Sequence, residues 1–407
     1  MPVLHNIKLL ATCPYNQQQD DIGIINDAAL VWLENKIIWV GSEKNLPRDY
    51  VDFSKIDAQQ SVVIPGLVDC HTHLAFGGSR AHEFVLRAKG ETYLNIPKAG
   101  GGIAFTVHTT RQATKEELVT KAHGFLTDIA TLGVTTLECK TGYGLTFQDE
   151  LKLLEVYDEL KSLTPITLVT TLLAAHIVPE EFKSDRAAYI RMICDELIPE
   201  VAKRKLAQFC DVFVETLAFS VAEAEVIFAT AKTHGLIPKL HADQLTDTHS
   251  GALAAHVGAA SADHLEYTND LGIKAMARAE VVAVSLPIAS TYLRQAAMDA
   301  RKFIKAGVKV AIATDFNPGS APCYDMHLAM TLGCINNYLT PHEALKASTS
   351  FAARALRLEQ SHGSLGPGYA ADFVLLNPID INHWLYHFRR NNVRAVYKSG
   401  ERICPAD

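Results

Sequence analysis

Two histidines separated by a single residue, His71 and His73, follow the apolar run LVDC at residues 67–70. In an extended strand, residues i and i+2 point to the same side, so the two imidazoles can converge on one cation. On its own the pair is a weak signal, because the chain has 17 histidines and a histidine without any ligand role is the alternative reading. Its meaning depends on which other ligands the fold brings to the same place.

Further ionisable residues stand at the ends of later apolar runs, namely His241, His264 and Asp315. Together with His71 and His73, His241 and Asp315 supply three imidazoles and one carboxylate, a ligand set that suits zinc or iron and leaves room for a water. We therefore predict a metal site formed by these four residues. A metal there would lower the pKa of a bound water toward neutrality and polarise a carbonyl group under attack.

Bringing these residues together requires a fold in which several strands end at one rim. From Thr135 onward, apolar strand-like runs alternate with helical patterns, which indicates repeated βα units around a parallel sheet. In a TIM barrel the C-terminal rim carries the active site, and the predicted ligands fall there together with His176, which ends the third strand. Eight strands, the number that closes such a barrel, are expected at residues 67–71, 134–140, 166–176, 210–215, 237–242, 260–264, 281–287 and 308–315.

Helices are expected between the strands where apolar residues recur at helical spacing, for example at residues 115–133, 147–163 and 221–235. The segment 84–111 breaks this rhythm, because a glycine triplet, as in KAGGGIAFTV, is not expected inside a helix. We predict that this segment is a long active-site loop after the first barrel strand.

The two ends of the chain differ from its middle. Short strands separated by turn glycines occur within residues 22–64 and 364–404. We expect them to form one composite β-sandwich domain of residues 1–65 and 360–407, beside a barrel domain of residues 66–359. The expected fold class is therefore α/β, a (β/α)8 TIM barrel with a small composite β-sandwich domain formed by the N- and C-terminal segments.

The composition limits the classes of function. The chain has 38 Lys and Arg against 45 Asp and Glu, a formal net charge of −7, so the clustered basic surface of a nucleic-acid-binding protein is not expected. It contains no run of about 18 uncharged apolar residues and no basic start followed by a long apolar run. The eight cysteines are scattered, without a Cys-x-x-Cys pair. We expect a cytoplasmic protein with reduced thiols that acts on a small molecule and binds neither nucleic acid nor membrane.

The chain resembles the amidohydrolase superfamily in four segments around the predicted ligands: VIPGLVDCHTH (63–73), KLHADQ (239–244), SADH (261–264) and IATDFNPGS (312–320). The later segment GSLGPGYAADFVLLN (363–377) is similar to the return strand of that superfamily. The resemblance implies a metal-dependent hydrolase.

Within the superfamily, the chain resembles the imidazolonepropionases in CKTGYGL (139–145), AAHIVPEEF (174–182) and the AGGGIAFTV segment. This resemblance covers essentially the whole chain. It implies hydrolysis of the cyclic amide of 4-imidazolone-5-propanoate to N-formimidoyl-L-glutamate, a step of histidine degradation.

The resemblance also bears on the number of metal ions. Binuclear members of the superfamily carry a carboxylated lysine at the end of strand four, where this chain has Glu215 and Thr216. We therefore expect one metal ion per subunit, either Zn²⁺ or Fe³⁺, since the mixed nitrogen and oxygen site suits both. Lys140, which ends strand two, is open to three interpretations: a partner for nearby acids, a solvated charge or a catalytic group.

The resemblance implies catalytic roles for Asp315 and His264. Asp315 would accept the proton of the water and later give it to the departing ring nitrogen. His264 would act beside the metal as an electrophile or proton shuttle, with a fourth metal ligand as the alternative. Some relatives have a glutamate where Gln244 stands here, and an amide cannot transfer protons in that role. We therefore assign Gln244 to substrate binding.

Substrate binding has to accommodate a propionate carboxylate and a planar polar ring. The fork of Arg80 can bind both carboxylate oxygens, although an isolated arginine would more often be a solvated surface charge. Tyr143 and His176 match residues that, in the family, contact the ring of the substrate and the product. Packing at the rim of the barrel is the alternative role for both. The family's remaining contacts to the ligand match Asn317, Gly319 and Ser320. Hydrogen bonds within a turn are the alternative role of these three residues.

A deaminase of guanine or cytosine type is the alternative enzyme reading. Those relatives share the His-x-His pair, two later histidines and an aspartate, but they usually carry a glutamate near the strand-five histidine, where this chain has Gln244. A metal-free scaffold is the non-enzyme reading, and the five ionisable residues at the rim argue against it. By fold-level analogy we also expect a homodimer.

Overall fold

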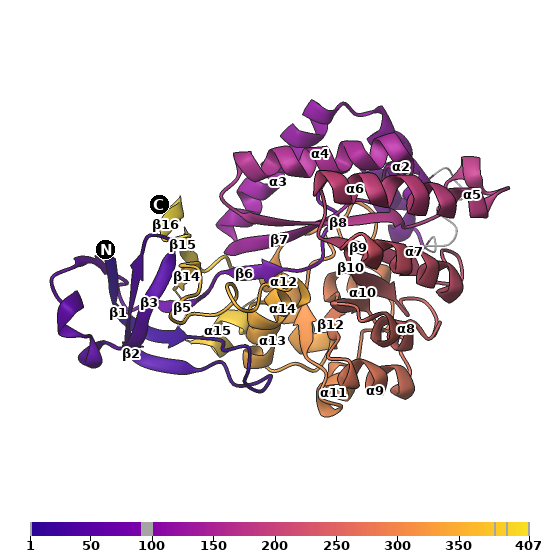
Figure 1. Cartoon of the computed structure of the whole chain (residues 1–407). Coiled ribbons are helices and arrows are strands. Elements are labelled where there is room, and N and C mark those ends of the chain that lie inside the picture. The colour runs from indigo at the N-terminus through magenta and orange to yellow at the C-terminus, as the bar shows by residue number, and fades with distance from the viewer. Residues whose placement is uncertain (1, 91–100, 378–379, 388–389, 406–407) are drawn as a thin grey trace.

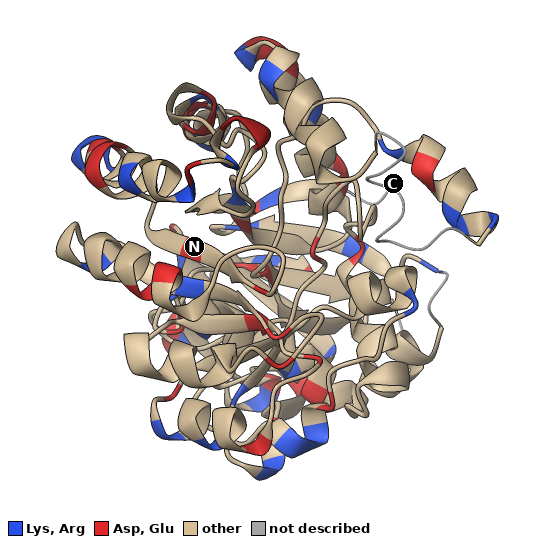
Figure 2. Ribbon diagram, turned by 90° about the vertical axis from the view of Figure 1, so that its right-hand side faces the viewer, with Lys and Arg blue, Asp and Glu red and all other residues tan. Residues whose placement is uncertain are grey.

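The computed structural model describes residues 2–90, 101–377, 380–387 and 390–405. The chain forms two lobes (Figure 1): a small β-domain contains both ends of the chain, and its middle forms a larger barrel covered by helices. Figure 2 shows that basic and acidic positions are intermixed along the outer helices of the barrel. Among the described residues, no helix is long and apolar enough to cross a bilayer.

Eight parallel strands form the barrel in the order in which they occur along the chain. Backbone hydrogen bonds close it between the first and last strands: the Asp315 amide donates to the His71 carbonyl at 3.0 Å, and the His73 amide donates to the Phe316 carbonyl at 2.8 Å. The strands are almost wholly buried because helices cover one face and side chains fill the other, which explains their near-continuous apolar runs. The predicted TIM barrel is confirmed, with strands β6 (Leu67–Asp69), β7 (Val134–Lys140), β8 (Thr167–Ala175), β9 (Phe209–Val214), β10 (Ile237–Ala242), β11 (Ser261–His264), β12 (Val282–Ser285) and β13 (Val310–Ile312).

Three predicted helices between the strands are present as α3 (Lys115–Thr131), α4 (Phe147–Leu163) and α7 (Val221–Thr233). Two of them begin at capping boxes. In a capping box, the hydroxyl of the N-cap residue accepts the backbone amide of a glutamate three residues later, and the carboxylate of that glutamate accepts the backbone amide of the N-cap residue. In α3 the pair is Thr114 and Glu117, and in α7 it is Ser220 and Glu223.

Most other helices cover the outside of the barrel (Figure 1). A π-type turn, η5 (Met192–Leu197), joins two of them into one continuous rod. The remaining helices and single turns are η1 (Glu43–Asn45), η2 (Arg48–Tyr50), η4 (Glu180–Phe182), α5 (Arg186–Arg191), α6 (Ile198–Arg204), α8 (Ser250–Val257), α9 (Asp270–Arg278), α10 (Pro287–Leu293), α11 (Ala300–Lys305), α12 (Met326–Asn336), α13 (Pro341–Ala347), α14 (Ser350–Ala355) and α15 (Ile381–Tyr386).

The prediction of a long loop at residues 84–111 is wrong for the described part of that segment. It contains most of α1 (Ala81–Ala88) and nearly all of α2 (Ile103–Gln112), while residues 91–100 lie outside the described residues. Gly102, with a φ of 77°, immediately precedes α2. This left-handed backbone, which glycine adopts without a steric penalty, lets the chain turn into the helix, so the glycine run marks a helix start.

Strands from both chain ends pair in one sheet of order β16-β15-β14-β5-β1-β2-β3, with β4 beside β1. The sheet folds over on itself, because Trp32 of β2 contacts Phe373 of β14 and Tyr397 of β15, strands that are not its neighbours, at centroid separations of 5.2 and 6.0 Å. The composite β-sandwich is confirmed, and β1 and β4 are strands that the sequence pattern did not reveal. The strands are β1 (Pro2–Ala11), β2 (Ile24–Leu33), β3 (Lys36–Ser42), β4 (Ser54–Asp57), β5 (Val62–Pro65), β14 (Phe373–Leu376), β15 (Val393–Lys398) and β16 (Glu401–Pro405). The limits at residues 65/66 and 359/360 remain our proposal for the domain boundaries.

Candidate metal centre and active-site cavity

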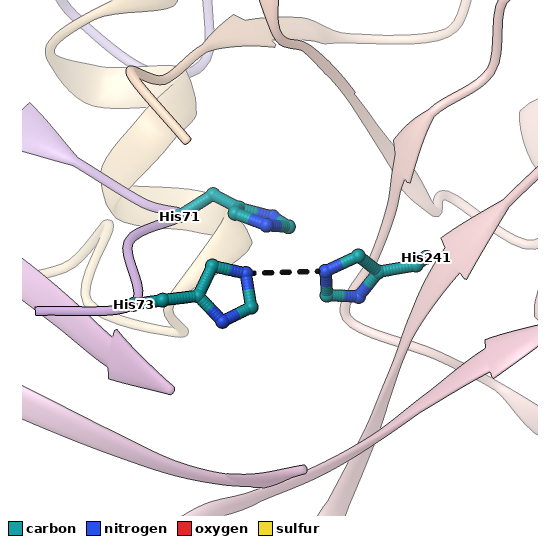
Figure 3. Close-up of side chains that lie close together, drawn as sticks. All are labelled: His71, His73 and His241. Atoms are coloured by element: carbon teal, nitrogen blue, oxygen red, sulfur yellow. Dashed lines mark hydrogen bonds between the residues drawn. The ribbon is translucent and has the colours of Figure 1, made fainter. Parts of the chain in front are cut away.

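Three buried histidines meet at the C-terminal rim of the barrel (Figure 3). His71 and His73 follow β6, and His241 lies in β10. Nε2 of His73 is 3.4 Å from Nε2 of His241, and one nitrogen of each of the three rings lies within 4.8 Å of the others. The extended backbone after β6 therefore presents its two imidazoles to the imidazole from the opposite side of the barrel.

Asp315 follows β13 and brings a carboxylate to the same point. Its Oδ1 lies 3.4 Å from Nε2 of His71 and 3.6 Å from Nε2 of His73. Donors at 2.0–2.1 Å from a tetrahedral ion are about 3.4 Å apart, so this spacing fits one transition-metal ion. Burial raises the pKa of Asp315 to about 6. Its backbone is left-handed, with a φ of 55°, a conformation unfavourable for a non-glycine residue that is found where surrounding contacts impose it.

Two buried aspartates orient the imidazoles. Asp263 Oδ2 is 2.6 Å from Nδ1 of His71, and Asp211 Oδ1 is 3.1 Å from Nδ1 of His241. Since an ionised carboxylate only accepts hydrogen bonds, each Nδ1 carries the hydrogen and each Nε2 turns its lone pair toward the centre. Nε2 of His71 is buried and has no hydrogen-bond partner among the described residues. A metal ion would supply the partner that this buried nitrogen lacks, so the residues present fit the metal that the sequence predicts.

A buried network of charges lies beneath the histidines. Nζ of Lys140 is 2.7 Å from Asp211, 3.1 Å from Glu138 and 3.5 Å from Asp263. Nζ of Lys239 is 2.9 Å from the other oxygen of Glu138. Burial alone would lower the pKa of Lys140, but the three carboxylates outweigh burial and raise it. Lys140 thus has the contacts of a partner for nearby acids. Burial alone would raise the pKa of Asp211, but Lys140 and His241 outweigh burial and hold that pKa well below its usual range.

His264, at the end of β11, faces the three histidines but is not among the groups whose atoms meet at the centre. Its ring centroid lies 5.4 Å from that of His241. Its Nδ1 is 3.8 Å from Oε1 of Glu266. Burial alone would lower the pKa of His264, but Glu266 and nearby aspartates outweigh burial and raise it. Like Asp315, His264 has a left-handed backbone, with a φ of 78°, so an imidazole with a raised pKa is held beside the candidate metal centre in an unfavourable backbone conformation.

A cavity with about 450 Å³ of empty volume opens above the centre. It brings together ten of the residues that the sequence singles out, whereas His71 lies beneath it and Gly319 is not part of its wall. Ile103 and Phe213 are apolar members that sequence reasoning missed. The cavity is lined by His73, Arg80, Ile103, Tyr143, His176, Phe213, His241, Gln244, His264, Asp315, Asn317 and Ser320.

Arg80, which immediately precedes α1, reaches the cavity as a paired cation. Its Nε donates to Oε1 of Glu83 at 2.9 Å, and its Nη2 donates to Oε2 at 2.8 Å. Glu83 also accepts the amide of Gly102 at 2.7 Å. A Cβ at Gly319 would lie 2.0 Å from Nη1 of Arg80. The bidentate pair therefore fixes the guanidinium, and the glycine leaves it room to approach the loop after β13.

Tyr143 and His176 form one wall of the cavity. The ring of His176 stacks on His73 at a centroid distance of 5.3 Å, and Tyr143 lies 5.6 Å from both. Nδ1 of His176 donates to the carbonyl of Gly142 at 3.0 Å, which leaves Nε2 as the acceptor nitrogen. Burial lowers the pKa of His176 to about 3, so this ring is neutral.

Asn317 and Ser320 border the cavity but also build their own turn. Oδ1 of Asn317 accepts the amides of Gly319 and Ser320 at 2.8 Å each, and its Nδ2 donates to the carbonyl of Asp315 at 2.6 Å. These hydrogen bonds are turn chemistry, the alternative to substrate binding for both residues. The amide of Gln244, by contrast, makes no hydrogen bond to another described residue, so it can bind a ligand.

Several acids that support the site were missed. Glu138, Asp211 and Asp263 stand inside buried strands, where an uncompensated charge would be very costly. A charged residue within an apolar run is itself the signal that could have identified them. Ile103 and Phe213 give no such signal, because an apolar residue at the cavity wall looks like any other core residue in sequence.

The overall fold is similar to solved deaminases. The 5-methylcytosine deaminase from Klebsiella pneumoniae, bound to 5-fluorocytosine, matches with a TM-score of 0.75 at 15% identity, over 100% of this chain and 98% of that chain. A guanine deaminase from C. acetobutylicum with bound guanine matches with a TM-score of 0.73 at 16% identity, over 99% of this chain and 100% of that chain. At this level of identity the likeness concerns the fold alone.

The sequence comparisons are more specific. The model of the Amidohydrolase family matches residues 62–403. An imidazolonepropionase from Geobacillus kaustophilus is 43% identical over 392 residues, 95% of this chain and 92% of that protein. One from Myxococcus xanthus is 46% identical over 370 residues, 90% of this chain and 88% of that protein. With such identity over nearly its full length, the chain belongs to the imidazolonepropionase family of amidohydrolases.

Proposed function

We propose that the chain hydrolyses the cyclic amide of 4-imidazolone-5-propanoate to N-formimidoyl-L-glutamate, a step of histidine degradation. The observation that carries the proposal is the single cavity in which a three-histidine and aspartate centre stands with Arg80 and Gln244. In such a cavity the histidine and aspartate centre can activate a water, Arg80 can bind a carboxylate, and the amide of Gln244 can bind a polar ring. The identity of 39–46% to imidazolonepropionases supports the same reaction.

In this reaction the oxygen of water bonds to the carbonyl carbon, the ring C–N bond breaks, and the nitrogen takes up a proton. A metal held by His71, His73, His241 and Asp315 would supply a water of lowered pKa and polarise the carbonyl. Asp315, whose pKa is raised to about 6, takes the proton from the water and returns it to the nitrogen. His264 stabilises the carbonyl oxygen as negative charge develops on it, since the raised pKa of His264 favours the protonated ring.

The same proposal assigns the remaining cavity residues to substrate binding. Arg80 holds the propionate carboxylate while Glu83 orients its guanidinium. The amide of Gln244 and the rings of Tyr143 and His176 contact the imidazolone. The turn after β13 completes the binding site with Asn317, Gly319 and Ser320.

Turnover of freshly prepared imidazolonepropionate, followed by loss of its ultraviolet absorbance, tests the proposal. Guanine and cytosine are the controls, because the folds of their deaminases are similar to this one. We expect hydrolysis of the imidazolone alone, since Gln244 lacks the acid that deaminases usually place there to protonate ammonia. Release of ammonia from guanine or cytosine, with no turnover of imidazolonepropionate, would overturn the assignment.

We further propose one ion per subunit, Zn²⁺ or Fe³⁺, because the donor set closes on a single point. Metal analysis of the active protein should find one equivalent, and complete chelation should abolish activity. Two equivalents per chain would contradict the proposal.

A homodimer and a cytoplasmic location complete the proposal. The five buried cysteines, Cys13, Cys70, Cys139, Cys194 and Cys210, are free thiols in the structure, which suits a reducing compartment. The homodimer rests on analogy of fold. Sedimentation equilibrium of the purified protein would test the oligomeric state.

A further inference from the structure

Glu215, a buried side chain directly after β9, is turned toward the loop that follows the neighbouring strand β10. Its Oε2 accepts the amide of Leu245 at 2.8 Å and that of Thr246 at 3.2 Å. Its Oε1 accepts the amide of Thr216 at 2.9 Å and the hydroxyl of Thr246. The carboxylate therefore joins two loops of the rim, and it bonds to the backbone immediately beyond Gln244.

Glu150 makes the same kind of contact at another part of the rim. It lies in the first turns of α4, is fully buried, and accepts backbone amides of the loop after β7. Its Oε1 accepts from Gly144 and Leu145 at 2.8 Å each, and its Oε2 accepts from Gly142 at 3.3 Å. These three amides flank Tyr143 on both sides.

In each loop, a non-glycine residue close to the cavity residue has a left-handed backbone. Leu145, two residues after Tyr143, has a φ of 56°, and Asp243, directly before Gln244, has a φ of 48°. A left-handed non-glycine residue persists only where its surroundings impose that conformation. Charge-assisted hydrogen bonds from amides to a carboxylate are among the stronger ones, so each glutamate helps to hold its loop in this shape. In the loop after β10, the carboxylate of Asp243 contributes as well by accepting the amides of Thr248 and Ser250.

Neither glutamate lines the cavity above the metal centre. Glu215 faces instead a separate pocket behind the loop, lined also by Thr216, Leu217 and Thr248. Any effect of either glutamate on the substrate must therefore pass through the loop that it holds.

We propose that Glu150 and Glu215 are positioning residues that set two substrate contacts, Tyr143 and Gln244 respectively, by fixing the backbone around each. The proposal rests on the function given above, since it takes both cavity residues as substrate contacts. Each glutamate acts on its own loop, and this makes the two effects separable.

Double-mutant cycles separate positioning from a general structural role. Glu215→Gln should lower kcat/KM by about 10-fold, mainly through KM, in the wild-type background. In a Gln244→Ala background the same change should cost less than about 2-fold, because the side chain that it positions is already gone. In a Tyr143→Ala background the full 10-fold loss should remain. Glu150→Gln should behave in the reverse manner, losing its effect only with Tyr143→Ala.

Glu343→Gln is the matched control, because Glu343 is a buried glutamate that accepts the amide of Thr340 at the start of α13, away from the cavity. It should lower the unfolding temperature without changing kcat/KM. Metal content should stay at the wild-type value in all variants. Where Glu215→Gln fails to fold, Thr246→Val, which removes only the hydroxyl donor, replaces it in the cycle.

Amide hydrogen exchange of the metal-loaded protein without substrate gives a second readout. Glu215→Gln should speed exchange within residues 243–248 and leave residues 141–145 unchanged, and Glu150→Gln should do the opposite. Equal losses of kcat/KM in both backgrounds, or exchange that rises in both loops alike, would overturn the positioning role. Absence of wild-type turnover of imidazolonepropionate would instead refute the proposed function, and the exchange result would still decide whether the glutamates hold their loops.

Discussion

The core of the β-domain and the rim of the barrel are both buried, but the first consists of packed aromatic side chains and the second of ionisable ones. In the β-domain, the rings of Trp32, Phe373 and Tyr397 pack against one another, with Phe373 and Tyr397 stacked at 4.5 Å. At the rim, buried histidines and aspartates are held by lysines and by one another. Apolar burial contributes stability directly, whereas a buried ionic network contributes little net stability and instead fixes geometry. The difference predicts that mutations in the β-domain affect stability and mutations at the rim affect activity.

Asp315→Asn should have the largest effect on activity and tests the rim side of the comparison most strongly. It removes at once the proposed carboxylate ligand of the metal and the proposed proton acceptor, so we expect kcat to fall by about 10⁴-fold. The midpoint of thermal unfolding of the metal-free protein should shift by less than about 2 °C. Steady-state kinetics, metal analysis and calorimetry measure these effects, and near-normal kcat with full metal content would move proton transfer to another residue.

Trp32→Ala should have the largest effect on stability and tests the β-domain side. It empties the centre of the aromatic cluster and removes the indole donor to the Gly400 carbonyl, so the free energy of unfolding should fall by about 3–5 kcal/mol. Because Trp32 lies outside the cavity, kcat per folded molecule should stay at the wild-type value. Urea titration and kinetics on the same sample check both statements, and a large fall in kcat at full folding would break the separation of the two regions.

His264→Asn should reduce kcat by about 10²-fold, the usual scale for losing a group that stabilises the charge developing on the reacting oxygen. Metal content should stay nearly intact, because the three histidines and Asp315 form the centre without it. Kinetics together with metal analysis measure the two quantities. Loss of metal along with activity would make His264 a ligand.

Arg80→Ala should lower kcat/KM by about 10- to 100-fold through KM, because a charge-assisted bidentate contact contributes about 1.5–3 kcal/mol. Lysine should restore only part of the loss, since it lacks the planar fork. Arg80→Ala also leaves the carboxylate of Glu83 unpaired, so the double variant Arg80→Ala/Glu83→Gln is the control for stability. Wild-type kcat/KM in the alanine variant would place the carboxylate pocket elsewhere.

The eight barrel strands could be predicted because burial on both faces demands continuous apolar residues, and such runs are visible in the sequence. β1 could not, since its pairing with β2 shifts register between Leu4 and Ile7, where Asn6 adopts a φ of 57°. A bulge of this kind interrupts the alternation that marks a strand. The helices α1 and α2 were missed because the glycine run between them indicated a loop over the whole segment.

The sequence by itself predicted the types of the proposed ligands and the rim at which these side chains stand, because residue type and position within a βα unit are local properties. It could not assign the partners behind them. Asp263 meets His71 from 192 positions away, and Lys140 reaches Asp211 across 71 positions. Which buried carboxylate faces which imidazole or ammonium depends on the order and stagger of the strands around the closed barrel. Only the tertiary structure sets this order and stagger, and they decide which opposite charge each of these buried side chains meets.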